Sequence, residues 1–324
     1  KATNKKLLIY LMPVRIQLKT IVCSLFCLHL IQLNGQQEVI FSQYMFNHQS
    51  LNPGYSGSKE YTNFTILHRS QWLNFEGAPE SQAFTFNHKM TSKNIGFGLS
   101  GVNDKIGPMT SSRVALDLAY HLELEKAFLS IGIKLGVVNY DFNQSIIRTT
   151  NIGDNSFVFD GQGEFKSNIG FGMYYHRPRW YAGISIPWFI ENESFNIQRH
   201  YYGILGGIFN LAEGLKLKPS TLIKYTVGAP FGYDLSAIML FKDTFWIGPQ
   251  MRSTFTSVLP RSKFGGGFGI IAGIHLNKTV SLGYSFNTSS LGKYINVNHS
   301  THELMMRFDL IPTVKNILRS PRIF

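Results

Sequence analysis

The chain contains a stretch in which large apolar side chains alternate strictly with small or polar ones, Arg113-Val114-Ala115-Leu116-Asp117-Leu118-Ala119-Tyr120-His121-Leu122. Successive side chains of a β-strand point to opposite faces, so this alternation predicts a strand with one apolar face. The same pattern returns around residues 129–137, 215–225 and 280–287, and no helical pattern of comparable length accompanies it. The sequence therefore predicts an all-β fold.

Extending the pattern along the chain predicts about fourteen strands, each near the ten residues that a tilted transmembrane strand needs. Their expected starts are Thr62, Ser81, Asn94, Thr110, Ala127, Phe165, Arg179, Arg199, Leu215, Phe231, Thr244, Ser262, Thr279 and His302. Short connections, such as 123–126, alternate with longer ones, such as 101–109 and 142–164. Short periplasmic turns and long external loops are typical of bacterial outer-membrane barrels. We expect a transmembrane antiparallel β-barrel of this type, with both termini in the periplasm.

Composition supports this class and argues against others. Charged residues make up 15% of the 324 residues, against about 25% in soluble globular proteins. A mean hydropathy of -0.03 is typical of a barrel, in which half of each strand faces lipid and half faces a polar lumen. The net charge is +12, but the basic side chains are spread along the chain. They form no stripe suited to a phosphate backbone, so we expect no nucleic-acid binding.

The first 35 residues have the pattern of a targeting segment. Basic residues precede an apolar run at 20–33, and Gly35 offers a small-residue exit, which predicts a secretory signal peptide spanning 1–35. Both cysteines, Cys23 and Cys27, lie inside it. The processed chain would therefore contain no disulfide and no cysteine ligand or nucleophile.

Three further parts follow the signal peptide. Residues 36–60 do not alternate, yet they hold several large apolar side chains that need cover, so we expect an N-terminal plug or a periplasmic docking segment. The transmembrane barrel is expected over 61–311, and a C-terminal tail over 312–324. The outer membrane is the expected location.

Charged residues are expected at inward-facing strand positions. The basic ones are Arg113, Lys134, Lys166, Lys216, Lys218, Lys224, Arg252, Lys263 and Arg307, and the acidic ones are Asp117, Asp234, Glu303 and Asp309. A basic lumen could form an anion-preferring pore. We favour the alternative, in which these groups pair across strands or bind a plug, because an unpaired buried charge is costly.

No motif predicts catalysis, a cofactor or a metal. The stretch Gly96 to Gly101 reads G-x-G-x-x-G, but it continues a strand instead of joining a strand to a helix, as a dinucleotide site requires. Glycines that line a crowded lumen are the favoured explanation. His299, His302 and Glu303 could hold a metal, although a loop entering the last strand explains them better. We expect a protein that is not an enzyme and has no cofactor.

Several motifs together resemble the PorP/SprF family. They are Phe41-Ser42-Gln43-Tyr44-Met45-Phe46-Asn47, Leu51-Asn52-Pro53-Gly54-Tyr55-Ser56-Gly57, Arg69-Ser70-Gln71-Trp72 and Gly77-Ala78-Pro79, followed by looser matches to near the end of the chain. Gly54 stands where the family pattern has Ala. The resemblance implies an outer-membrane barrel of Bacteroidota that serves type IX secretion or gliding motility. It supplies these candidate partner-binding residues: Phe41, Ser42, Gln43, Tyr44, Asn47, Asn52, Pro53, Gln71, Trp72, Gly77, Ala78 and Pro79.

The function implied by this resemblance is export or surface anchoring of a partner protein such as an adhesin. Its partners would be outer-membrane lipid, the secreted cargo or adhesin, and other type IX secretion components. The alternative is a passive outer-membrane channel or a hydrophobic-solute transporter. Conductance distinguishes the two, because a plugged anchor is electrically quiet.

Overall fold

The computed structural model describes residues 38–59, 61–73, 75–90, 94–143, 163–191, 198–229, 231–254, 265–289 and 300–311. All of them belong to the second of two compact units, which spans Gln36–Phe324. The expected signal peptide and C-terminal tail therefore lie outside the described residues.

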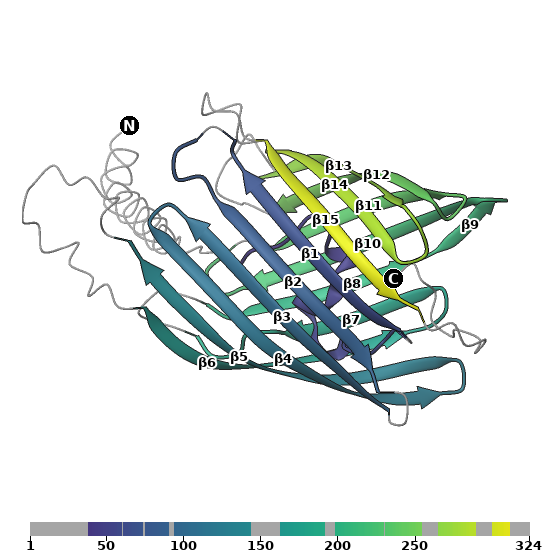
Figure 1. Ribbon diagram of the computed structural model, residues 1–324, viewed down its shortest axis with the longest axis horizontal. Coiled ribbons are helices and arrows are strands. Elements are labelled where there is room, and N and C mark those ends of the chain that lie inside the picture. Colours follow the sequence, from purple (N-terminus) through teal and green to yellow (C-terminus); the bar gives the residue numbers. More distant parts are fainter. Residues whose placement is uncertain are drawn as a thin grey trace, which may run out of the picture. The chain divides into compact units, whose positions relative to one another are not determined.

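The described residues form a closed antiparallel barrel (Figure 1). The strands are β1 (Thr62–Gln71), β2 (Glu80–Lys89), β3 (Ile95–Ile106), β4 (Met109–Leu124), β5 (Ala127–Phe142), β6 (Glu164–His176), β7 (Trp180–Ile186), β8 (His200–Gly207), β9 (Phe209–Ala212), β10 (Leu215–Thr226), β11 (Gly232–Phe241), β12 (Phe245–Thr254), β13 (Gly265–His275), β14 (Val280–Ser289) and β15 (Thr301–Leu310). No described helix is long and apolar enough to cross a membrane.

Each strand pairs with its neighbours in sequence, and β15 pairs with β1 in the register Thr62↔Leu310 to close the ring. Strands β8 and β9 both pair with β10 and are separated by Ile208, so together they occupy one position in the barrel. The ring therefore has fourteen strand positions, as predicted. Among the described residues, closure pairs both edges of every strand except the short β9, which pairs only with β10. Paired edges are the condition for a sheet to cross a bilayer.

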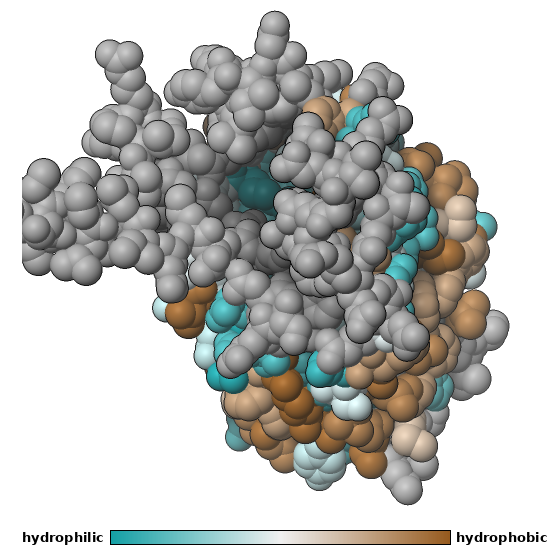
Figure 2. All heavy atoms as spheres, turned by 90° about the vertical axis from the view of Figure 1, so that its left-hand side faces the viewer, coloured by the Kyte–Doolittle hydropathy of each residue, from teal (hydrophilic) through white to brown (hydrophobic). Residues whose placement is uncertain are grey.

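The two faces of the strands differ as the alternation predicts. In β4, Leu116 and Leu118 are 45% and 43% exposed, whereas Asp117 and Ala119 are 0% and 2% exposed. The exposed apolar side chains form the outer wall, where hydrophobic residues dominate (Figure 2). The covered positions line the interior.

The connections also differ between the two ends, and one of them corrects a prediction. Short turns join β4 to β5, β6 to β7 and β14 to β13 at one end, which we call the short-turn end. The opposite end, the long-loop end, holds the connections 143–163 and 187–199. The long connection predicted over 101–109 is wrong, because β3 continues to Ile106 and pairs with β4 through Ile106↔Met109. Gly107, with a φ of +55°, makes the tight turn that replaces the expected loop.

The inner segment and the barrel interior as candidate functional site

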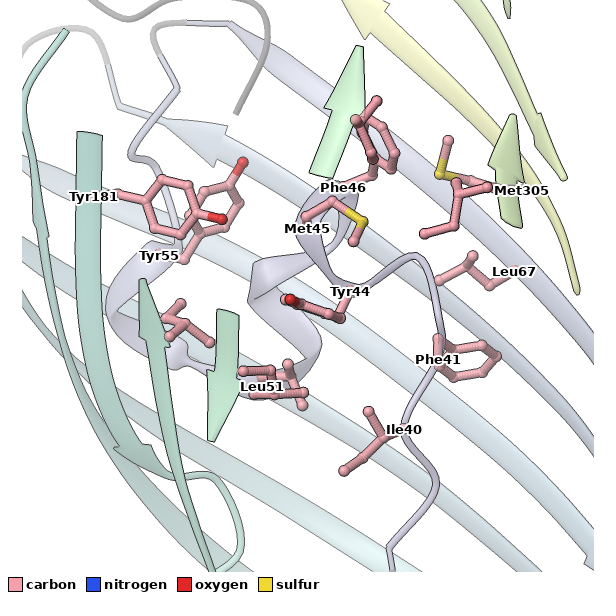
Figure 3. Close-up of a cluster of buried hydrophobic side chains, with 14 of the residues drawn as sticks. Ile40, Phe41, Tyr44, Met45, Phe46, Leu51, Tyr55, Leu67, Tyr181 and Met305 are labelled. Atoms are coloured by element: carbon pink, nitrogen blue, oxygen red, sulfur yellow. The ribbon is translucent and has the colours of Figure 1, made fainter. Parts of the chain in front are cut away.

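Residues 38–59, here called the inner segment, lie within the interior of the barrel (Figure 3). The segment forms three short helical turns, η1 (Tyr44–Phe46), α2 (His48–Leu51) and η2 (Pro53–Tyr55). The Asn52 side chain starts η2 by accepting a hydrogen bond of 2.8 Å from the Gly54 amide. Pro53 takes the first helical position, where its missing N–H costs nothing.

Large apolar side chains of the inner segment pack against the inner faces of the strands. Phe41 lies beside Leu67 of β1, and the rings of Phe46 and Trp246 are 5.3 Å apart (Figure 3). Met45 is fully buried. Covering a side chain of this size contributes about 1.5–3 kcal/mol. The apolar residues that needed cover therefore find it inside their own barrel.

Side chains of the wall bind the backbone of the inner segment near the long-loop end. Glu303 of β15 accepts hydrogen bonds from the amides of Ser42 at 2.7 Å and Gln43 at 2.9 Å. Arg69 of β1 donates to the carbonyl of Ile40. Gln250 of β12 donates to the Ser42 carbonyl at 2.9 Å. These hydrogen bonds are made to backbone atoms of the inner segment. They therefore depend on the backbone path of the segment more than on the identity of its side chains.

A second set of hydrogen bonds holds the segment deeper in the barrel. Thr85 of β2 donates to the Asn47 side chain at 2.9 Å, and Asn52 donates to the Met173 carbonyl of β6 at 2.9 Å. Gln49 reaches the Asp117 carboxylate at 3.2 Å. Thr85, the Met173 carbonyl and Asp117 are thus partners of the inner segment in the buried lumen, where hydrogen bonds to polar groups are needed.

Glycines make room for the segment at its closest approaches. A Cβ at Gly96 would overlap the backbone of Ser56 and Gly57, and a Cβ at Gly132 would overlap Pro53 and Gly54. Gly98 would similarly meet the side chain of Gln49. Gly96 and Gly98 of the G-x-G-x-x-G stretch therefore line a crowded lumen, as favoured from the sequence, whereas Gly101 packs against Phe84.

Several charged side chains of the lumen form ion pairs. Lys134 lies 2.9 Å from Asp117, and Lys224 and Arg252 each lie 2.9 Å from Asp234. Other pairs are Arg307 with Asp309 at 2.8 Å, Arg113 with Glu38, and Lys216 with Asp243 at 2.6 Å beside the short-turn end. Lys218 places its Nζ 4.5 Å from the centre of the Phe46 ring.

The prediction that these charges pair with one another or with the inner segment is thus confirmed for these residues. Two more basic residues belong to the predicted set. Lys166 is exposed near the long-loop end of β6. Lys263 lies outside the described residues.

The candidate partner-binding residues fall into two groups. Phe41, Ser42, Gln43, Tyr44, Asn47, Asn52 and Pro53 are buried in the inner segment. Gln71, Trp72, Gly77, Ala78 and Pro79 form the end of β1 and the β1–β2 connection at the long-loop end, where the Gln71 amide donates to Pro79 at 3.0 Å. Arg69 links the groups, because it binds the Ile40 carbonyl and also the Gln71 side chain at 3.1 Å.

Sequence reasoning missed most of the wall residues that hold the segment. Glu303 was placed in the lumen, but its partners Ser42 and Gln43 are 261 and 260 positions away. Arg69 belongs to a motif of the family resemblance, but no contact was predicted for it. Gln250 carried no signal except its place in an alternating strand. A spacing rule cannot find contacts that exist only after the ring has closed.

The metal site considered at 299–303 does not form. His302 points to the outer wall and bonds the Tyr284 hydroxyl at 2.7 Å, whereas Glu303 points inward. His299 lies outside the described residues. Among the described residues, no group of three His, Cys, Asp or Glu side chains could hold a metal ion.

A closed antiparallel barrel with an apolar outer wall and a polar interior defines an outer-membrane β-barrel protein. Within that class, the model of the type IX secretion system membrane protein PorP/SprF matches residues 33–308. The chain belongs to this family, so it is an outer-membrane barrel associated with type IX secretion. No curated protein matches it.

Solved structures similar to this chain include other outer-membrane proteins. The outer membrane protein Omp33 of Acinetobacter baumannii shares 8% identity with a TM-score of 0.47, over 79% of this chain and 100% of that one. CdiB of the same organism shares 8% identity with a TM-score of 0.42, over 77% and 60%. An outer membrane channel from Pseudomonas putida F1 shares 11% identity with a TM-score of 0.40, over 84% and 99%.

Proposed function

We propose that the barrel supports the export or surface anchoring of a partner protein, such as an adhesin, and that it works as a closed scaffold. One observation carries this proposal: the inner segment fills the interior that a channel would need. Three cavities between this segment and the wall measure about 30, 20 and 20 Å³. Each holds one or two water molecules at most.

The filled interior argues against the alternative, a passive channel or a transporter of hydrophobic solutes. A solute would have to displace side chains that are buried against the wall, including Tyr44 and Met45. We also propose that the role is not enzymatic. Polar lumen groups such as Glu303 and Thr85 are used to hold the inner segment.

We propose that the partner meets the barrel at the long-loop end, through the β1–β2 connection. Trp72, Leu73 and Phe75 are 38%, 40% and 51% exposed there. The rings of Trp72 and Phe75 lie 6.3 Å apart, and the Gly107 amide donates to the Gly77 carbonyl at 2.9 Å. A cluster of exposed apolar groups on a braced loop is typical of an interaction site.

The proposal is tested by replacing Trp72 and Phe75 with Ala in a tagged barrel and purifying it from native membranes in mild detergent. We expect the co-purifying surface protein to fall at least several-fold while the barrel itself remains assembled. Phe209→Ala is the matched control, because Phe209 is 55% exposed but lies near the short-turn end. Equal recovery of the partner with the unaltered barrel, the Trp72 and Phe75 double variant and the Phe209→Ala barrel would contradict the proposal.

A further inference from the structure

The inner segment has a direction, and its start lies at the long-loop end of the barrel. Glu38 pairs with Arg113 and accepts a hydrogen bond of 2.7 Å from the Tyr202 hydroxyl. Its amide lies 3.3 Å from the His200 ring nitrogen. His200 is the first residue of β8, directly after the long connection 187–199. The charged anchor of Glu38 is therefore built from residues at this end.

The end of the inner segment lies at the opposite, short-turn end. The Gly57 amide donates to the Asn87 side chain at 2.9 Å, close to where β2 ends at Lys89. Gly57 also lies directly against Gly96, at the start of β3. From there the chain enters β1 at Thr62, which is paired with the last strand residue, Leu310.

Between Glu38 and Gly57, successive residues of the inner segment contact wall residues that lie progressively farther from the long-loop end. Ser42 binds Glu303, two residues after β15 begins at the long-loop end. Asn47 binds Thr85, in the middle of β2. The segment thus runs through the lumen from one end of the barrel to the other.

We infer that this protein carries its own amino-terminal region across the outer membrane inside its barrel, so that Glu38 lies at the cell-surface mouth. Long connections of bacterial outer-membrane barrels face outward and short turns face the periplasm. Strand β1 starts from the periplasmic end, and the chain before it must already have crossed the lumen. This inference differs from the expectation that the amino-terminal side stays in the periplasm.

The anchors also tie the inner segment to the seam of the barrel. Arg69 and Glu303 belong to β1 and β15, the two strands whose pairing closes the ring. Both bind the backbone of the inner segment. The segment is therefore enclosed by the ring and held from both sides of its seam. A surface partner would meet the Glu38–Arg113 pair at the mouth instead of an open pore.

The experiment inserts a short polar epitope directly before Glu38 and measures antibody binding to intact cells. The same epitope after Gly77, in the β1–β2 connection, is the outward control. The same epitope inserted between Glu125 and Lys126, in the β4–β5 turn, is the periplasmic control. We expect the epitopes at Glu38 and Gly77 to be bound on intact cells, and the third only after permeabilisation. An epitope at Glu38 that requires permeabilisation overturns the inference.

A folded outer-membrane barrel migrates differently on a denaturing gel before and after boiling, and this heat-modifiable form reports assembly. If the inserted epitope abolishes this form, a second measurement is used. Val39→Cys places a thiol in the cavity near the long-loop end, which Val39 and Trp188 both line. A membrane-impermeant maleimide should label it on intact cells, as it labels Glu76→Cys but not Glu125→Cys. Labelling of Val39→Cys only after permeabilisation, or in neither condition, overturns the inference.

Discussion

Arg69 and Glu303 face each other across the seam of the barrel, in register between β1 and β15, and both bind the inner segment. Arg69 holds the Ile40 carbonyl, and Glu303 holds two consecutive amides that follow it. A donor and an acceptor thus lie on the two sides of the closure. The inner segment therefore contacts both strands of the seam, and these contacts add to the β1–β15 pairing that closes the ring.

The first prediction concerns this seam. Glu303→Gln replaces two acceptor oxygens with one and turns an amide group toward the Ser42 and Gln43 N–H groups. We expect a loss of about 1–3 kcal/mol, because a buried donor is left without its acceptor. The measurement is the temperature at which the folded gel form converts to the unfolded one. Glu76→Gln, in the exposed β1–β2 connection, should leave that temperature unchanged; equal shifts would show that the seam contact has no special weight.

The second prediction separates the two faces of β4. Leu118→Arg places a charge against lipid, at a cost of about 2–4 kcal/mol near the midplane. Ala119→Arg should also be harmful, because Ala119 is paired with Gly96 and Gly132, against which the inner segment packs. We expect deletion of residues 38–57 to restore assembly of the Ala119→Arg barrel but not of the Leu118→Arg barrel. Assembly is measured as the amount of heat-modifiable protein. If the deletion restores assembly of both variants, or of neither, this assignment of the faces is contradicted.

The third prediction concerns the glycines of the wall. Gly132→Ala should displace the inner segment, because the new Cβ would overlap the backbone of Pro53 and Gly54. Overpacking of this kind typically costs about 1–3 kcal/mol. Gly203→Ala is the matched control, since its nearest neighbour would be Ile223 at 3.6 Å, an ordinary contact. Proteolysis of intact barrels at the inner segment should increase only for Gly132→Ala; similar cleavage of the two variants would count against the close packing described.

The fourth prediction concerns conductance. In planar bilayers we expect the full barrel to be electrically quiet and the barrel lacking residues 38–57 to conduct. Loss of Glu38 leaves Arg113 without its partner, and Arg69 loses the Ile40 carbonyl. The opened lumen should therefore favour anions, which a salt gradient reveals as a shift in reversal potential. A conducting full barrel would instead support the channel alternative.

The strand pattern was available from the sequence because its cause is local. Alternation places Leu118 outward and Ala119 inward wherever a strand must meet lipid on one side, and the observed exposures agree. Fourteen of the fifteen observed strands start within three residues of an expected position, from Thr62 to Thr301. The exception is β9, which shares one barrel position with β8. The stretch 101–106 was misread as a loop, because its polar residues pair beyond the apolar part of the strand.

The path of the inner segment could not be obtained in this way. The large apolar residues of the segment indicated that it is buried somewhere. Burial in the lumen and burial against a periplasmic partner predict the same local sequence pattern. Contacts such as Ser42 with Glu303 join residues 261 positions apart and exist only when the seam has formed. Strand positions and faces follow from short-range periodicity and the apolar surroundings of the wall. The contents of the lumen and the direction of the segment follow from ring closure, which brings both ends of the chain around one interior.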